Sequence, residues 1–344
     1  MTDLERYARQ VRYAPLGEEG QRQLAQGRAL VCGCGALGSM IANTLVRAGV
    51  GFVRIVDRDF VEVTNLQRQV LFDEQDAADA LPKAVAAATK LKQINSDVVI
   101  DPVVADVHAG NIQQLAGDVN VIVDGTDNFE TRFLVNDFAV KHGIPWVYGG
   151  CIGAEGQTMT ILPGETGCLR CLISESPPPG STPTCDTAGI LASAAYVIAS
   201  IQALEAIKIL SDNRQAASRN LTIIELWENR IRQISVAHLR EQASRCPACD
   251  DQQFPWLEGK LTGQAAVLCG RNSVQLSPPA PAELSLDALA EKLASVGQLR
   301  QNRYLLRLAV DGYLLTIFAD GRAIVGGTDD PAVARTLYAR YVGT

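Results

Sequence analysis

Long hydrophobic runs are scarce in this sequence. No apolar stretch approaches the roughly 20 residues that a membrane-spanning helix needs, and the first residues, MTDLERYARQ, are polar and charged. We therefore expect no membrane partner, no signal peptide and a cytoplasmic location. An excess of basic residues is also lacking, because 31 Lys and Arg stand against 38 Asp and Glu, which gives a net charge of −7. This balance argues against a nucleic-acid partner.

Histidine is rare too, and its three copies, His108, His142 and His238, are scattered without a motif. We therefore predict no Ser-His-Asp or Cys-His catalytic set. Cysteine is better represented: nine copies in a chain with no expected secretion signal indicate metal or thiol chemistry rather than a disulfide framework. A length of 344 residues, 47% of them hydrophobic, is sufficient for one large domain and a smaller one.

The strongest local pattern covers residues 28–57. An apolar run leads into the glycine turn Gly33-Cys34-Gly35-Ala36-Leu37-Gly38, a helical pattern stops at Gly49, and a second apolar run ends at Asp57. This order predicts a strand, a tight turn, a helix and a second, parallel strand.

Each glycine of the turn has a mechanical reason. Gly33 permits the tight turn, Gly35 lets the backbone approach a phosphate, and Gly38 lets the helix lie near the sheet. Asp57, at the tip of the second strand, can bind ribose hydroxyls. We predict a nucleotide site here. The alternative is a glycine-rich turn with no ligand, because the GxGxxG pattern alone is weakly specific.

Positive charge follows the second strand. The segments Asn65-Leu66-Gln67-Arg68-Gln69 and Leu81-Pro82-Lys83 place two cations and an amide near the predicted nucleotide site. Such a set suits a triphosphate better than a dinucleotide, because cations pair with phosphate charge. Taken singly, Arg68 and Lys83 could equally be solvated surface residues.

A further acidic residue, Asp127, follows the buried strand predicted over 120–124. Ligands of open parallel sheets bind at the carboxyl ends of the strands, which favours a functional role for this carboxylate. The alternative is that Asp127 caps the helix predicted over 129–142.

Two CxxC pairs, Cys168/Cys171 and Cys246/Cys249, carry the metal prediction. Each pair offers two thiolates from one tight turn, and two pairs complete a tetrahedral zinc site with bonds of ~2.3 Å. Because the protein fills all four positions, the zinc would be structural. The alternatives are redox dithiols or merely packed thiols.

Proline-rich sequence, LISESPPPGSTPT, precedes Cys185 and predicts a crossing loop over 172–187 before a helix over 188–210. A cysteine on such a loop, near a helix N-terminus, can be activated as a nucleophile. The alternative is that Cys185 is a non-essential loop residue. After residue 258 the pattern changes to short strands, hairpin signals and two helices, which predict a small α+β domain of unassigned role over 259–344.

Taken in order, these motifs resemble those of a known family. They are RYARQ, GCGALGS, IVDRD, NLQRQ, LPK, DGTDN, TCDTAG, QALEAIK and the two CxxC pairs. The set is similar to the bacterial members of the ubiquitin-activating-enzyme superfamily, the ThiF/MoeB/HesA adenylyltransferases, and its proline-rich loop favours the ThiF-like side. The resemblance spans about residues 4–255. It implies an α/β fold with a doubly wound, Rossmann-like, mostly parallel sheet over residues 1–258.

Several roles rest on this resemblance and not on spacing. It assigns Arg9 to the ATP site of the other subunit of a homodimer, magnesium binding to Asp127, and thioester or persulfide chemistry to Cys185. The predicted cofactors are ATP, magnesium and zinc. The predicted ATP-binding residues are Gly33, Gly35, Gly38, Asp57, Asn65, Arg68 and Lys83. The predicted catalytic residues are Arg9, Arg68, Lys83, Asp127 and Cys185.

The implied activity is ATP-dependent adenylylation of the C-terminal Gly-Gly carboxylate of a ubiquitin-like sulfur-carrier protein. Sulfur transfer from a cysteine desulfurase or another donor would follow. Thiamin and molybdopterin synthesis both use such enzymes, so the sequence leaves the carrier open. The alternatives are activation of a ubiquitin-like modifier for conjugation, a non-catalytic carrier-binding protein, and an NAD-dependent oxidoreductase. The last would leave Arg68, Lys83 and the paired cysteines unexplained.

Overall fold

The computed structural model describes residues 4–177, 185–236, 245–261, 265–268, 272–276 and 284–343. The chain forms two compact units, Met1–Leu261 and Thr262–Thr344.

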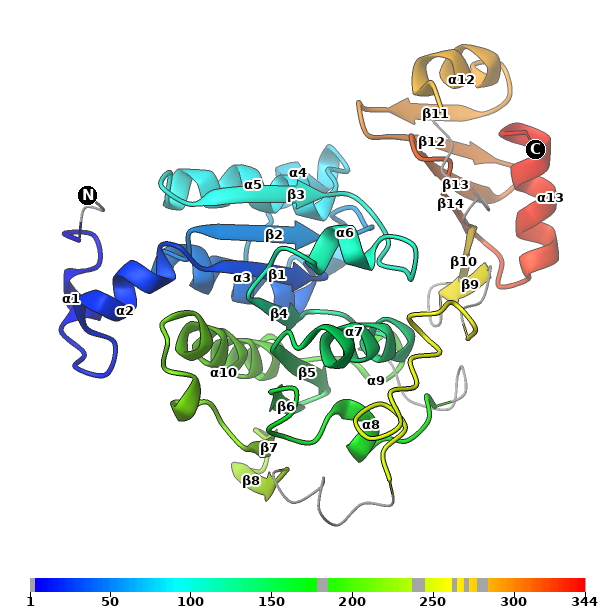
Figure 1. Ribbon diagram of the computed structural model, residues 1–344. Coiled ribbons are helices and arrows are strands. Elements are labelled where there is room, and N and C mark those ends of the chain that lie inside the picture. Colours follow the sequence, from blue (N-terminus) through cyan, green and yellow to red (C-terminus); the bar gives the residue numbers. More distant parts are fainter. Residues whose placement is uncertain are drawn as a thin grey trace. The chain divides into compact units, whose positions relative to one another are not determined.

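An eight-stranded sheet forms the centre of the first unit (Figure 1). Its strand order is β3-β2-β1-β4-β5-β6-β7-β8, with parallel pairing from β3 to β5 and antiparallel pairing from β5 to β8. The strands are β1 (Arg28–Cys32), β2 (Phe52–Val56), β3 (Val99–Val103), β4 (Val121–Asp124), β5 (Trp146–Ile152), β6 (Glu155–Ile161), β7 (Asn220–Glu225) and β8 (Arg230–Ser235).

Helices cover both faces of this sheet, because successive strand residues point to opposite faces. Ala29 and Val31 of β1 pack with α3, α5 and α10, whereas Leu30 and Cys32 pack with α6 and α7. This arrangement confirms the predicted doubly wound α/β fold. Among the described residues of the unit, the helices are α1 (Ala8–Val11), α2 (Gly17–Leu24), α3 (Ala36–Ala48), α4 (Glu74–Ala78), α5 (Lys83–Ile94), α6 (Ile112–Ala116), α7 (Phe129–His142), α8 (Leu169–Leu172), α9 (Cys185–Ala188) and α10 (Ala192–Leu210), with 3-10 turns at Val63–Asn65 and Arg214–Ala216.

The helix predicted over 188–210 is divided, so the prediction of one continuous helix is wrong. Between α9 and α10, Gly189 takes a φ of +76° and Ile190 forms a bridge with Gly153. Glycine adopts this left-handed conformation without strain, and it ends a helix. Of the predicted crossing loop, residues 178–184 lie outside the described residues, and so does the side chain of Cys185.

The 19 residues of α10 are long and apolar enough to cross a membrane by length and composition alone. The expectation that no run approaches this length is therefore wrong. Half of the most apolar window of α10 is buried, and the helix packs on α3 and on β5. Such burial is typical of the core helix of a folded domain.

An N-terminal arm, made of α1 and α2, is attached at the end of α3 that is remote from the glycine turn. The ring of Tyr7 packs against Gly49, and Gln10 Nε2 donates to the carbonyl oxygen of Ala48 at 2.9 Å. Asn95 Nδ2 donates to the Tyr7 hydroxyl at 2.7 Å. In Figure 1 the arm lies where β1 and β2 begin, away from their carboxyl ends.

The second unit has a six-stranded antiparallel sheet in the order β11-β12-β13-β14-β10-β9. Leu289 and Leu337 of its two helices pack on one sheet face with Leu308 and Val325. The unit is therefore α+β, as predicted. Its elements are β9 (Ala265–Leu268), β10 (Ser273–Leu276), α12 (Leu286–Leu293), β11 (Gln298–Gln301), β12 (Leu305–Val310), β13 (Tyr313–Phe318), β14 (Ala323–Gly326) and α13 (Pro331–Tyr341).

Candidate nucleotide and metal sites

The glycine turn between β1 and α3 packs directly against the loop that follows β4. Gly33 has a φ of +87°, and a Cβ atom on it would lie 2.7 Å from the carbonyl oxygen of Gly125. A Cβ atom on Gly38 would lie 1.8 Å from the carbonyl oxygen of Gly33, so both positions exclude a side chain. On Gly35 the nearest atom would be 3.9 Å away, which leaves room for a phosphate at the N-terminus of α3.

Asp57, at the end of β2, holds the turn by hydrogen bonds. Its Oδ2 atom accepts the amide of Cys34 at 2.6 Å, and Oδ1 accepts the amide of Asp59 at 2.7 Å. Burial raises the pKa of Asp57 above its ordinary value, while the charge of Lys83 and these two amide bonds act against the rise. The carboxylate therefore orients the turn, and its predicted ribose contact stays a prediction.

Lys83 and Arg68 lie in different surroundings. Lys83 begins α5, is only 4% exposed, and pairs through Nζ with Oδ2 of Asp59 at 3.1 Å. Because it is buried and paired with Asp59, Lys83 is not an ordinary solvated surface residue. Arg68 is half-buried and donates from Nη1 to the carbonyl oxygen of Thr64 at 2.8 Å, so for Arg68 that alternative stays open.

The segment that carries Arg68 contributes two further side chains. Asn65 is buried, and its Oδ1 atom accepts the amide of Glu62 at 3.1 Å, so it shapes the 3-10 turn ahead of Arg68. Gln69 is 3% exposed, and its amide nitrogen lies 3.9 Å from where a Cβ atom of Gly35 would be. The sequence prediction missed Gln69, because nothing in the NLQRQ motif distinguishes it from Gln67.

Asp127 follows Gly125, the residue that contacts the glycine turn, by two positions, and Asp127 is exposed. The cap of α7 is Asn128, whose Oδ1 atom accepts the amide of Thr131 at 2.8 Å. The capping alternative for Asp127 is therefore wrong, and its carboxylate faces solvent at the carboxyl end of β4. An exposed carboxylate in this position can bind a cation.

Arg58 is a cation that the sequence prediction also missed. Its Nη1 atom lies 3.0 Å from Oδ2 of Asp106, which follows β3. Burial opposes the charge of Arg58, but the carboxylates of Asp106, Asp59 and Asp127 outweigh that effect and raise the pKa of Arg58 above its ordinary value. Asp127 is thus close enough to Arg58 to act on its charge.

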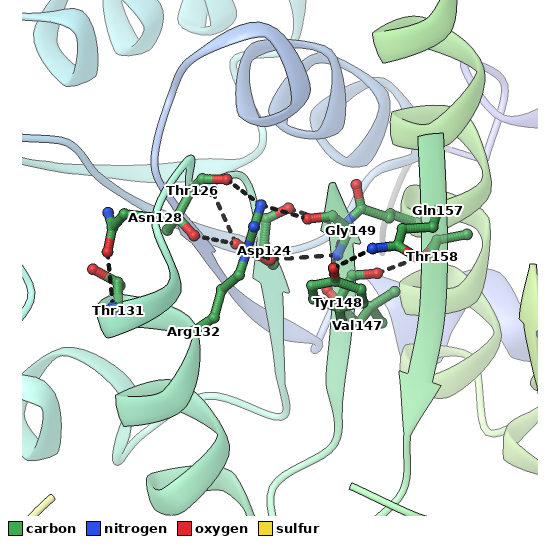
Figure 2. Close-up of polar contacts among 11 residues, drawn as sticks. Asp124, Thr126, Asn128, Thr131, Arg132, Val147, Tyr148, Gly149, Gln157 and Thr158 are labelled. Atoms are coloured by element: carbon green, nitrogen blue, oxygen red, sulfur yellow. Dashed lines mark hydrogen bonds and ion pairs between the residues drawn. The ribbon is translucent and has the colours of Figure 1, made fainter. Parts of the chain in front are cut away.

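A buried ion pair between Arg132 and Asp124 fixes the loop that follows β4 (Figure 2). Arg132 Nε lies 3.0 Å from Oδ2 of Asp124, and Arg132 Nη2 donates to the carbonyl oxygens of Thr126 at 2.7 Å and Gly149 at 2.9 Å. Asp124 also accepts the amide and the hydroxyl of Thr126 at 2.9 and 2.7 Å. The pair joins the end of β4 and the middle of β5 to the first turn of α7.

Arg9 is the predicted site residue that the fold does not bring to the glycine turn of its own chain. It is exposed on α1, and the arm is fixed to the C-terminal end of α3 through Tyr7 and Gln10. The glycine turn lies at the other end of this 13-residue helix, roughly 20 Å away at 1.5 Å per residue.

Four thiols meet at the predicted zinc site, and all four sulfur atoms lie within 4.8 Å of one another. The Sγ separations are 3.8 Å for Cys168–Cys246, 3.9 Å for Cys168–Cys171 and 3.8 Å for Cys171–Cys249. Four bonds of ~2.3 Å in a tetrahedron place sulfurs about 3.8 Å apart. The cluster therefore fits a structural zinc ion. Thiols that are merely packed together would not require these sulfur–sulfur distances.

The C-terminal half of α7 ties both cysteine turns to the sheet. Asp137 is fully buried and pairs with Arg170, which lies between Cys168 and Cys171, at 3.4 Å. The other carboxylate oxygen accepts the amide of Trp256, beyond the second cysteine pair, at 3.1 Å. Burial raises the pKa of Asp137 to about 6, while the Arg170 charge acts against the rise.

Comparison with known proteins decides the family. A ThiF family domain matches residues 7–248, which is more than half of the chain. The chain belongs to the ThiF family. A Bacillus subtilis sulfur carrier protein ThiS adenylyltransferase is 45% identical over 339 residues, covering 98% of this chain and 99% of that protein. This match extends through the second unit.

Two other relatives match over shorter lengths. A Thermus thermophilus sulfur carrier protein adenylyltransferase is 36% identical, covering 73% of this chain and 92% of that protein. A Haloferax volcanii SAMP-activating enzyme E1 is 39% identical, covering 66% of this chain and 83% of that protein. The crystal structure of Escherichia coli MccB with ATP, 22% identical, aligns with a TM-score of 0.61 over 71% of this chain and 74% of that chain, which shows a shared fold.

Proposed function

We propose that this ThiF-family protein is an adenylyltransferase that uses ATP to activate the C-terminal Gly-Gly carboxylate of a ubiquitin-like sulfur carrier. The observation that carries the proposal is the placement of the open glycine turn, the buried cation Lys83 and the exposed carboxylate Asp127 at the carboxyl ends of the parallel strands of one sheet. The names of the Bacillus and Thermus relatives, both sulfur carrier protein adenylyltransferases, support it.

The proposed reaction is a substitution at the α-phosphorus of ATP. A carboxylate oxygen of the carrier forms the new bond to phosphorus, the bond to the bridging oxygen breaks, and pyrophosphate leaves with its electron pair. Negative charge grows on the leaving group, so fixed cations lower the barrier. Lys83 and Arg68 would supply that charge, and the α3 N-terminus would hold phosphate oxygens through its free amides.

Magnesium would be held by Asp127, whose exposed carboxylate supplies the oxygen ligand that this ion prefers. When bound, the ion would neutralise part of the charge on the phosphates. The Asp124–Arg132 pair would keep Asp127 in place, because it fixes Thr126 immediately before Asp127.

A homodimer would complete the site. The arm that carries Arg9 is fixed at the C-terminal end of α3, roughly 20 Å from the glycine turn of its own chain, so we expect Arg9 to serve an ATP site of another subunit. A two-fold dimer would use each arm once, with the arginine adding charge beside the triphosphate.

We further propose a ThiS-like carrier, hence a role in thiamin synthesis, since the Bacillus relative covers both units of this chain. A cytoplasmic location and a cysteine desulfurase as sulfur donor accompany this proposal. Activation of a ubiquitin-like modifier is the second candidate function, and the name of the Haloferax relative, SAMP-activating enzyme E1, favours it.

The test is ATP–pyrophosphate exchange with a ThiS-type carrier that ends in Gly-Gly. We expect exchange that depends on this carrier, is lost when its last glycine is removed, and falls at least 100-fold in Lys83→Ala, since one fixed charge contributes about 3 kcal/mol to such a transition state. Lys90→Ala, on a more exposed part of the same helix, is the matched control and should retain exchange. Exchange without any carrier, or tight NAD binding in place of exchange, would contradict the proposal.

A further inference from the structure

Asn136 of α7 is a buried amide aimed at the four-cysteine cluster. Asn136 is 0% exposed, and both the oxygen and the nitrogen of its side-chain amide form hydrogen bonds. The Oδ1 atom accepts the amide of Leu169 at 2.8 Å, and Nδ2 donates to Sγ of Cys168 at 3.6 Å. A single side chain thus contacts a candidate zinc ligand and the backbone of the turn that carries it.

The charge of a zinc site explains why such a donor matters. Four thiolates and one Zn²⁺ carry a net charge of −2, and burial of that charge is unfavourable unless polar groups face the sulfurs. Cys168 is 1% exposed and Cys246 is 3% exposed, so water has little access to these two sulfurs, whereas Cys171 and Cys249 are partly exposed. The Asn136 amide supplies Cys168 with a donor that solvent does not.

The backbone bond adds a geometric effect. Leu169 is the first residue of α8, and its amide has no acceptor within that short helix. By accepting this amide, Asn136 fixes the direction of the Cys168–Cys171 turn before metal binds. A preset turn loses less conformational freedom when its thiolates coordinate the ion.

From these contacts we infer that Asn136 is a positioning residue of the zinc site, which strengthens zinc binding through an N–H···S bond to Cys168 and a cap on Leu169. The same helix face carries Arg132, four residues earlier, whose guanidinium holds the Asp124 loop. One face of α7 therefore supports both the metal cluster and the loop of the nucleotide site.

The test uses Asn136→Asp, which keeps an oxygen to accept the Leu169 amide but lacks the N–H donor. Asn95→Asp is the matched control, because Asn95 is 1% exposed and bonds Tyr7 and Val46 at the end of α5, on the opposite face of the sheet. The full-length variants, loaded with Zn²⁺, are titrated with a chromogenic chelator at pH 8, and thermal unfolding is recorded for loaded and stripped samples.

We expect Asn136→Asp to bind Zn²⁺ 10- to 100-fold more weakly than the parent protein, the usual range for the loss of a partner behind a metal ligand. Asn95→Asp should lower the melting temperature but keep zinc affinity within about twofold. An unchanged affinity in Asn136→Asp, or an equal loss in Asn95→Asp, would overturn the inference.

A second variant covers the case in which Asn136→Asp does not fold. In Asn136→Ser, Co²⁺ replaces Zn²⁺, and the thiolate-to-cobalt charge-transfer band reports directly on the sulfur electrons. We expect this band to shift relative to the Co²⁺-loaded parent, because Cys168 has lost its donor. A band that keeps its position and intensity would overturn the inference.

Discussion

Replacing Arg132 with methionine removes the guanidinium that pairs with buried Asp124 and donates to two carbonyl oxygens, those of Thr126 and Gly149. Loss of one partner from a buried ion pair leaves an uncompensated charge and costs about 3–5 kcal/mol. We therefore expect the free energy of unfolding of the first unit to fall by about 4 kcal/mol. Urea unfolding, followed by tryptophan fluorescence, to which fully buried Trp146 contributes, measures the change as a lower midpoint concentration of urea at an unchanged slope.

Two further variants separate this cause from general damage. Arg132→Met combined with Asp124→Asn should recover about 1–2 kcal/mol, because the amide still accepts a hydrogen bond and leaves no buried charge. Arg22→Met is the control, since Arg22 pairs with Glu18 on the surface of α2, where ion pairs contribute little. A loss below about 1 kcal/mol for Arg132→Met, or no recovery in the double variant, would refute the reasoning.

Three other predictions concern the metal, the cysteine that begins α9 and the arm. Cys246→Ser should lower zinc content and melting temperature together while ATP affinity in the folded fraction barely changes; metal-free protein of unchanged stability would rule out a structural zinc. Cys185→Ala should leave pyrophosphate exchange near normal and impair sulfur transfer to the carrier, whereas an equal loss of both would place Cys185 in the ATP site. Arg9→Ala and Asp127→Ala should each be inactive alone. After subunit exchange of equal amounts, about half of the dimers carry one intact site, so roughly a quarter of parent activity should return; no recovery would show that Arg9 serves its own subunit.

Much of the glycine turn is predictable from sequence because its constraints are local. The spacing of Gly33, Gly35 and Gly38 follows from backbone contacts within one strand–turn–helix unit. The four-cysteine cluster is equally predictable from sequence, since tetrahedral zinc needs four thiolates and each CxxC turn supplies two. In the glycine turn and in the CxxC pairs, the residue spacing in the sequence determines the local geometry.

The side chains that orient the site are less predictable, because their partners come from distant elements. Arg132 meets Asp124 and Gly149 only after β4 and β5 have paired, and Gln69 meets Gly35 across the edge of the turn. The break at Gly189 was missed for the same reason: the apolar pattern continues through it, and the bridge of Ile190 to Gly153 is a tertiary contact. For Asp127, the capping alternative is excluded by a detail of the structure, the hydrogen bond that the Asn128 side chain accepts from the amide of Thr131.

Intact mass measurement of the carrier after incubation with this protein, ATP and Mg²⁺ would detect the acyl-adenylate itself. A hydroxylamine trap, added in a parallel sample, reports the activated carboxylate chemically. We predict a carrier bearing one AMP at its terminal glycine, stoichiometric pyrophosphate, and no adduct with Lys83→Ala or with a carrier lacking the last glycine. Release of ADP or free phosphate, or a carrier that stays unmodified while pyrophosphate accumulates, would contradict this prediction.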